Sequence, residues 1–174
     1  MGLDILTEAG QITVEQENRA REIFEFHNPG IQYCPTPKDA PAKVDAVLMS
    51  RSGDLLAVVE TKCRNMTVKH FREELAYRWL VTWEKVESAR VIASQLCLPF
   101  YGFLYLTESD TLMVLEISDH MGLYSTSLYI EATKTQETVN GGETVRNNAY
   151  IDMNAAERYA LREDEEPGEP LPFP

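Results

Sequence analysis

Two carboxylates and one ammonium in the middle of the chain have the types and spacing needed to act together. Asp45, Glu60 and Lys62 lie within the segment KVDAVLMSRSGDLLAVVETKCRN. Because side chains alternate across a β-strand, Glu60 and Lys62 are predicted to share one face while Thr61 points to the other. Charged groups on an otherwise apolar strand are costly unless something neutralises them. If Asp45 starts the neighbouring strand of a hairpin, all three charged groups converge at one edge of a sheet.

Such a group of side chains suits hydrolysis of a phosphodiester. Two carboxylate oxygens, a backbone carbonyl and waters form the oxygen-rich site that Mg²⁺ prefers. The ion neutralises charge that develops on the phosphate and lowers the pKa of a bound water. A lysine beside it can position the attacking water. The expected cofactor is therefore Mg²⁺, with Mn²⁺ as a substitute.

The elements that position these residues follow from the hydrophobic pattern. Residues 13–27 predict an amphipathic helix, and the Pro-rich residues 31–43 predict a loop. Residues 44–50 and 55–63 predict a hairpin whose second strand, rich in Val and Leu, is covered on both faces. Further helices are predicted at residues 67–78 and 83–96, whereas residues 78–82 fit either a helix or an extended segment.

The second half of the chain predicts mainly strands. They are expected at residues 100–108, 111–118, 123–132 and 144–153, with Asn140-Gly141-Gly142 as the last turn. Asn154 and Glu157 have the spacing of a capping box that opens a short helix, AAERYAL. This order predicts an α/β or α+β domain over residues 1–162, with a mixed central β-sheet flanked by helices. Residues 163–174 are acidic and Pro-rich, and a disordered tail is expected there.

The sequence resembles the PD-(D/E)XK nuclease superfamily. The match is Asp45 followed, after a gap of fourteen residues, by Glu60-Thr61-Lys62. A helix with the pattern Glu17-Asn18-Arg19-Ala20-Arg21-Glu22-Ile23-Phe24 precedes it, as in many members of that family. The resemblance covers about residues 13–108. One departure is that Lys43-Val44 precede Asp45, where the nominal motif has proline.

This resemblance implies a restriction-endonuclease-like core and a Mg²⁺-dependent deoxyribonuclease, of a kind common in phages and mobile elements. Asp45 and Glu60 would bind the metal together with the backbone carbonyl of Thr61. Lys62 would position or activate the water, and Glu17 would assist the metal site. The expected activity is hydrolysis of DNA, and the alternatives of endonuclease and exonuclease action both stay open.

Basic and aromatic residues near the motif are candidates for substrate contacts. His70, Arg72 and Lys85 could hold a phosphate backbone, although a solvated helix surface is the simpler interpretation of His70. Trp79 and Trp83 could stack on nucleobases, but their four-residue spacing is also typical of a core.

Composition limits the partners. The formal net charge is −12, whereas residues 43–90 hold nine Lys or Arg against seven acids and so carry +2. Weak intrinsic affinity for DNA is expected, with a homodimer or a protein partner supplying additional grip. The three cysteines form no CxxC pair, which disfavours a zinc site. No apolar run is long enough to span a bilayer, so we expect no membrane association and a cytoplasmic location, in a prokaryotic cell or a phage-infected host.

Three other interpretations stay open. Glu60 and Lys62 could form an ordinary charge pair at a sheet edge. The chain could keep the nuclease fold but act as a non-catalytic binding or regulatory protein, which the negative charge favours. It could also be a DNA mimic that inhibits a nuclease, which predicts acidic residues on an ordered surface.

Overall fold

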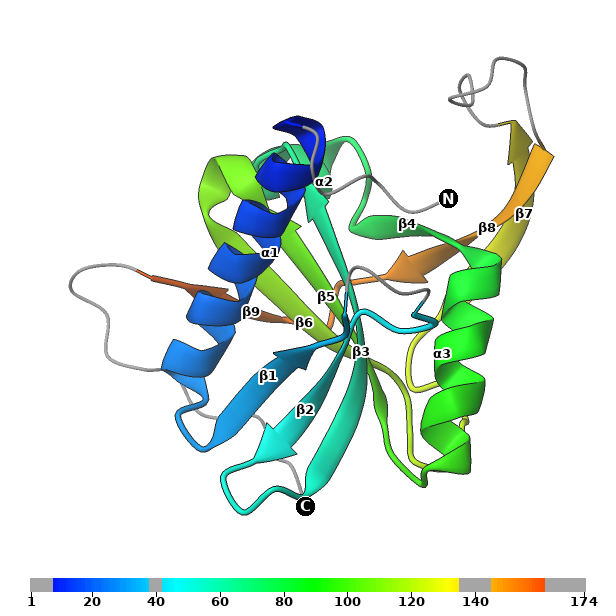
Figure 1. Cartoon of the computed structure of the whole chain (residues 1–174). Coiled ribbons are helices and arrows are strands. Elements are labelled where there is room, and N and C mark those ends of the chain that lie inside the picture. Colours follow the sequence, from blue (N-terminus) through cyan, green and yellow to red (C-terminus); the bar gives the residue numbers. More distant parts are fainter. Residues whose placement is uncertain (1–7, 38–41, 135–144, 162–174) are drawn as a thin grey trace.

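A mixed six-stranded sheet lies between a long helix on one face and a second helix with a small sheet on the other (Figure 1). The computed structural model describes residues 8–37, 42–134 and 145–161. The helices are α1 Glu8–His27, α2 Val68–Glu73 and α3 Trp83–Gln95, with a 3₁₀ turn at Thr107–Ser109. The strands are β1 Ile31–Pro35, β2 Ala46–Ser50, β3 Leu55–Arg64, β4 Arg78–Thr82, β5 Phe100–Leu106, β6 Thr111–Ser118, β7 Leu128–Lys134, β8 Val145–Asp152 and β9 Glu157–Ala160.

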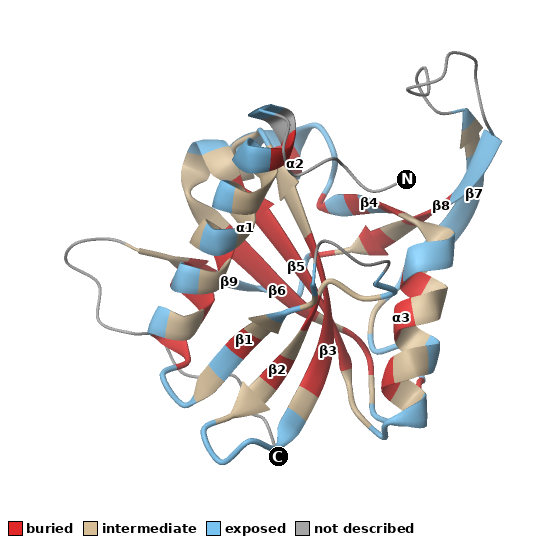
Figure 2. Cartoon of the chain, in the orientation of Figure 1, coloured by how far each residue is buried: buried red, intermediate tan, exposed pale blue. Residues whose placement is uncertain are grey.

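The large sheet has the strand order β1-β2-β3-β5-β6-β9. The pair β3–β5 is parallel and the other neighbours are antiparallel. A parallel pair needs a crossover connection, which here consists of α2, β4 and α3. The central strands are covered on both sides, and every residue of β5 is buried, which explains its continuous apolar sequence (Figure 2).

Helix α1 covers one face of this sheet. Its residues Ala20, Ile23 and Phe24 are almost fully buried and pack on that face, which includes Tyr33 and Phe103. The rings of Phe24 and Phe103 lie 4.9 Å apart, centroid to centroid. The predicted helix at residues 13–27 is therefore confirmed, although α1 begins earlier, at Glu8.

The opposite face packs against α3 and against a three-stranded sheet of order β4-β8-β7. Trp79 and Val81 alternate inward along β4 and are nearly inaccessible. A Cβ added to Gly102 would lie 2.4 Å from Trp79 Cζ3 and 2.8 Å from Ile117 Cδ1. Only glycine at position 102 therefore lets the indole lie this close to the central strands.

Several predicted elements are correct. The hairpin of β2 and β3, helix α3 and the antiparallel pair β5–β6 occur where the pattern placed them. Both β7 and β8 are strands, and the mixed sheet flanked by helices matches the expected class. The predicted turn at residues 140–142 and the acidic tail at residues 163–174 lie outside the described residues. No helix within the described ranges has the length and apolar character needed to cross a bilayer.

Three predictions were wrong, and in each case pairing between distant segments decides the structure. The Pro-rich stretch after α1 is not all loop, because β1 pairs with β2. The helix predicted for residues 67–78 ends at Glu73. Residues 78–82 take the extended one of their two predicted forms, as β4, which pairs with β8. The last predicted helix is strand β9, paired with the edge of β6. The amide groups of Asn154 bond to Asp152 Oδ1 instead of capping a helix.

Candidate functional site

Asp45 lies immediately before β2 and is held by two hydrogen bonds to β3. Its backbone N–H donates to the carbonyl of Val59 at 3.1 Å, which extends the hairpin pairing by one residue. Its Oδ2 accepts from the backbone N–H of Thr61 at 2.9 Å. The second oxygen, Oδ1, is 3.8 Å from Lys85 Nζ. The carboxylate is thus fixed beside the middle of β3, as the hairpin predicted.

Glu60 is a fully buried acid on the central strand. Its Oε1 lies 3.2 Å from Lys62 Nζ and 3.1 Å from Lys85 Nζ. Its Oε2 is buried and has no hydrogen-bond partner among the described residues. Burial, together with the nearby charge of Asp45, raises the pKa of this carboxyl, while the two lysines oppose that change. A buried carboxylate oxygen without a partner is unusual in a folded protein and costs stability.

Lys85 reaches the same place from α3. Its ammonium lies between the two carboxylates, closer to Glu60 than to Asp45. Burial alone would lower its pKa, but the charges of Glu60 and Asp45 outweigh that effect and the pKa is raised. Lys85 is therefore an ammonium at neutral pH. The sequence suggests Lys85 as a substrate contact, and the structure places it between the two carboxylates.

The alternation predicted along β3 is present. The side chains of Glu60 and Lys62 share the face toward α3, where they form an ion pair. Thr61 points to the α1 face, where its Oγ1 hydrogen-bonds the hydroxyl of Tyr33 at 2.8 Å. Thr61 can therefore offer only its backbone to the charged cluster. Sequence reasoning missed Tyr33 because it fell in a predicted loop; its apolar neighbour Ile31 at alternate spacing was the available signal.

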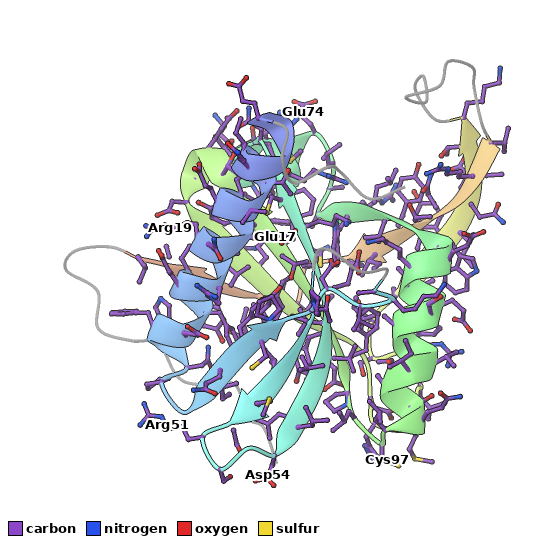
Figure 3. The ribbon with its side chains drawn as sticks, in the orientation of Figure 1. Glu17, Arg19, Arg51, Asp54, Glu74 and Cys97 are labelled. Carbon is purple, nitrogen blue, oxygen red and sulfur yellow. The ribbon has the colours of Figure 1, made fainter. Side chains whose placement is uncertain are left out.

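Glu17 lies on α1, and therefore on the opposite side of the sheet from α3 (Figure 3). Its charge and that of Asp45 both help to raise the pKa values of Tyr33 and Cys63. Burial is the larger cause, and it brings the pKa of the Cys63 thiol to about 12. Glu17 is thus close to the α1 side of the hairpin, whereas Lys62 and Lys85 occupy the other side.

His70 and Arg72 lie apart from this cluster. Both are exposed on α2, and Arg72 forms an ion pair with Glu73 at 2.9 Å. Within the described ranges, neither side chain forms a hydrogen bond or ion pair with Asp45 or Glu60. The structure therefore brings Asp45, Glu60, Lys62 and Lys85 together, and it leaves His70 and Arg72 on the surface.

The residues fit a magnesium ion that takes its remaining ligands from substrate and water. Among the described residues no three His, Cys, Asp or Glu side chains come together as a metal-binding group. Mg²⁺ commonly binds through one or two carboxylates completed by phosphate oxygens and waters. The unpartnered Glu60 Oε2, the Oδ1 of Asp45 and the carbonyl oxygen of Thr61 are suitable metal-ligand atoms.

Comparisons with known proteins add no assignment to this geometry. No protein-family model matches the chain, and neither the curated proteins nor the solved structures give a match.

Proposed function

We propose that this protein is a metal-dependent nuclease that hydrolyses DNA phosphodiester bonds. One observation carries the proposal: Glu60 is a fully buried carboxylate with an unpartnered oxygen, placed beside Asp45 and flanked by two lysines. Keeping such a group ionised inside a protein costs stability. A cost of this kind is typical of a site retained for chemistry.

The roles follow from where each group lies. Asp45 and Glu60, with the Thr61 carbonyl, would hold Mg²⁺, which supplies charge neutralisation at the phosphate and a more acidic water. Lys62 lies 3.2 Å from Glu60 and is partly exposed, so its ammonium can hold the attacking water or a phosphate oxygen. Glu17 would assist from the α1 side.

The fold is compatible with the PD-(D/E)XK proposal. With β1 and β4 inserted, the elements follow the order helix, antiparallel hairpin, helices and parallel strand that a restriction-endonuclease-like core would have, which supports the proposal. Asp45 lies one residue before β2 and the Glu-x-Lys triplet lies on the adjacent strand β3 of the same hairpin, close to the arrangement expected for that family. DNA as the substrate and Mg²⁺ as the cofactor remain parts of the proposal.

The test is cleavage of supercoiled plasmid and of labelled single- and double-stranded oligonucleotides with Mg²⁺, Mn²⁺ or EDTA. Glu60→Gln and Lys62→Met should each lower the cleavage rate by at least about a hundredfold. Asp54→Asn is the matched control, since Asp54 is exposed on the β2–β3 turn (Figure 3). Equal cleavage by folded Glu60→Gln and wild-type protein would refute the assignment.

A second candidate function is a non-catalytic binding or regulatory protein that keeps this fold. The observation in its favour is that Lys62 and Lys85 already neutralise the two carboxylates in a chain of net charge −12. Calorimetric titration with Mg²⁺ or Mn²⁺ separates the candidates. The nuclease should bind the metal and lose affinity in Asp45→Asn, whereas a structural ion cluster should show neither effect.

A further inference from the structure

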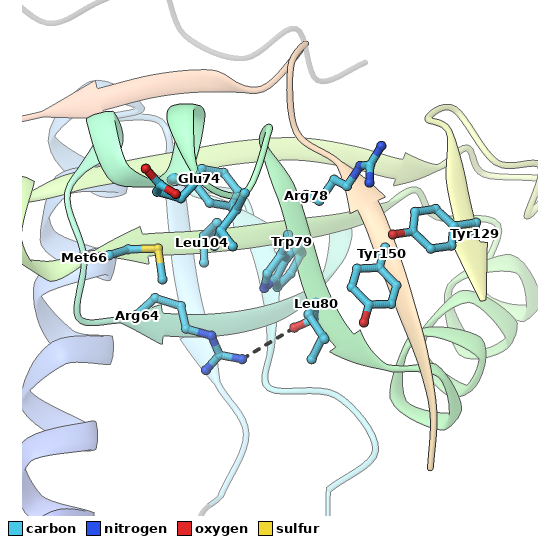
Figure 4. Close-up of a pocket in the computed structure, with 11 residues that line it drawn as sticks. Arg64, Met66, Glu74, Arg78, Trp79, Leu80, Leu104, Tyr129 and Tyr150 are labelled. Atoms are coloured by element: carbon cyan, nitrogen blue, oxygen red, sulfur yellow. Dashed lines mark hydrogen bonds between the residues drawn. The ribbon is translucent and has the colours of Figure 1, made fainter. Parts of the chain in front are cut away.

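A cavity of about 280 Å³ lies between the end of β3, α2, β4 and the β7–β8 pair (Figure 4). Its walls include Trp79, Leu104, Tyr129 and Tyr150. Ligand sites in proteins are usually about 300 Å³ or more and mainly apolar, with a few polar groups that fix orientation. This cavity is therefore the size for one small ring system and too small for a stacked pair of bases.

The register of the sheet places the cavity against the candidate reacting centre. Leu104, which lines the cavity, is the Cα partner of Lys62 in the β3–β5 pair. Gly102 is the partner of Glu60, and the ring of Trp79 packs on Gly102. The cavity and the candidate reacting centre therefore occupy neighbouring positions along the β3–β5 pair.

Arg64, at the end of β3, lies between the cavity and the candidate reacting centre along the strand. It lies two residues after Lys62 on the same face, about 7 Å along the strand. Its guanidinium makes only long contacts, at 3.4 Å, to the carbonyls of Cys63 and Leu80. Within the described ranges it forms no ion pair. This cation is free to bind a phosphate that enters or leaves the cavity.

The cavity also carries net positive charge in an acidic protein. Arg64 and Arg78 line it, against the single acid Glu74. The Arg78 guanidinium lies over the Tyr129 ring at 5.6 Å from its centroid, and the rings of Tyr129 and Tyr150 stack at 4.7 Å. Guanidinium and aromatic planes of this kind are the surfaces on which unstacked nucleobases rest.

One hydrogen-bond donor in the cavity wall has no partner. The indole Nε1 of Trp79 is buried and unsatisfied among the described residues, and the residue is only 1% exposed. A buried donor without an acceptor costs stability unless a ligand supplies one. A carbonyl oxygen or ring nitrogen of a nucleobase would supply that acceptor once the indole ring shifts enough to expose Nε1 to the cavity.

From these observations we infer that the cavity binds one unstacked nucleobase of a single-stranded nucleic acid. Arg64 holds the adjoining phosphate, and the next phosphodiester lies at Glu60 and Lys62. The location rests on the proposed nuclease function, because it assigns the substrate of that site, but the base-binding step needs no catalysis. It makes the preferred substrate a single strand or a locally unpaired duplex.

The test follows Trp79 directly. The chain has two tryptophans, so Trp83→Phe leaves Trp79 as the one indole reporter. A single-stranded oligonucleotide of about ten nucleotides, added in EDTA, should change the Trp79 emission, and its blunt duplex should bind at least about tenfold more weakly. If Trp83→Phe loses its fold, the indole N–H resonances of ¹⁵N-labelled wild-type protein give the same readout.

Variants place the binding in the cavity. Arg64→Gln and Tyr150→Ala should each weaken single-strand binding by roughly 5- to 100-fold. Arg51→Gln, an exposed arginine at the other end of the hairpin (Figure 3), should leave it unchanged. Oligonucleotide binding without a Trp79 response, and unaffected by Arg64→Gln, would overturn the inference.

The two proposals fail in different ways. Metal-dependent cleavage that needs Glu60 but proceeds without any Trp79 response would overturn the base-binding cavity and leave the nuclease. A Trp79 response that is lost in Arg64→Gln, in a protein that does not cleave, would support the cavity and overturn the nuclease. Absence of both overturns both.

Discussion

Replacing Lys85 by methionine should strengthen metal binding, because its ammonium lies where a cation between the two carboxylates would lie. Nζ is 3.1 Å from Glu60 Oε1 and 3.8 Å from Asp45 Oδ1. At an effective dielectric constant of about 20, a unit-charge pair at the shorter distance attracts by roughly 5 kcal/mol. The Lys85 side chain is 46% exposed, so solvent screening reduces the net effect to about 1–2 kcal/mol.

The expected result is a Kd for Mg²⁺ or Mn²⁺ that falls by roughly 5- to 30-fold in Lys85→Met, measured by calorimetric titration without nucleic acid. Lys69→Met is the matched control, because Lys69 is an exposed lysine on α2. Thermal unfolding supplies a second readout. Without the Lys85 ammonium, buried Glu60 keeps only Lys62 as a counterion, so Tm in EDTA should fall by about 2–8 °C. Added Mg²⁺ should reduce this difference in Tm between the variant and wild type.

Unchanged or weaker metal affinity in Lys85→Met would refute this reasoning. It would mean that the ammonium and the metal do not compete for the same oxygens. The cluster of Glu60, Asp45 and Lys85 would then be a structural ion network, and the non-catalytic candidate would gain support.

Two further predictions concern stability. Gly102→Ala should lower the free energy of unfolding by about 1–3 kcal/mol, measured as a lower denaturant midpoint, because the added Cβ would lie 2.4 Å from Trp79. Gly30→Ala is the control and should be nearly neutral, because nothing lies within 4 Å of a Cβ added there. Hydrogen bonds from Arg19 hold the pKa of Asp110 below its ordinary value of 3.8. The ionised Asp110 carboxylate therefore stabilises the folded state above pH 3.8, and this contribution is lost as the pH falls through the lowered pKa. Asparagine tolerates the local φ of 46°, so Asp110→Asn should lower the free energy of unfolding by about 0.5–1 kcal/mol at pH 7. The difference in unfolding free energy from wild type should vanish near pH 2. A constant difference between pH 7 and pH 2 would contradict this account.

The charged hairpin was predictable because the signals that define it are local. The apolar run of β3, the turn before it and the period of two place Glu60 and Lys62 on one face without knowledge of the rest of the chain. The same reasoning placed Asp45 across from them, and the bond from Asp45 to the Thr61 N–H agrees with it.

What the sequence could not indicate depends on partners far along the chain. The segment that begins at Asn154 has the sequence pattern of a helix start, but residues 157–160 form β9. The backbone of β9 bonds to β6, and its Tyr159 packs under α1. Lys85 meets Glu60 only because a crossover returns α3 over β3. Trp79 lies in the core on a strand and Trp83 packs against that core from a helix, and their four-residue spacing does not show that they belong to different elements. No period within a short window encodes these pairings.

The division of the molecule into two sheets also affects which parts of the site could change during evolution. The residues proposed for chemistry lie on or beside the large sheet and on α1 and α3, whereas much of the cavity wall comes from the three-stranded sheet. Tyr129 and Tyr150 lie on that smaller sheet and are exposed enough to be replaced without refilling a core. Selection could therefore alter which base the cavity binds while Asp45 and Glu60 stay unchanged. Among relatives, positions 129 and 150 should vary most between lineages that bind different nucleic acids.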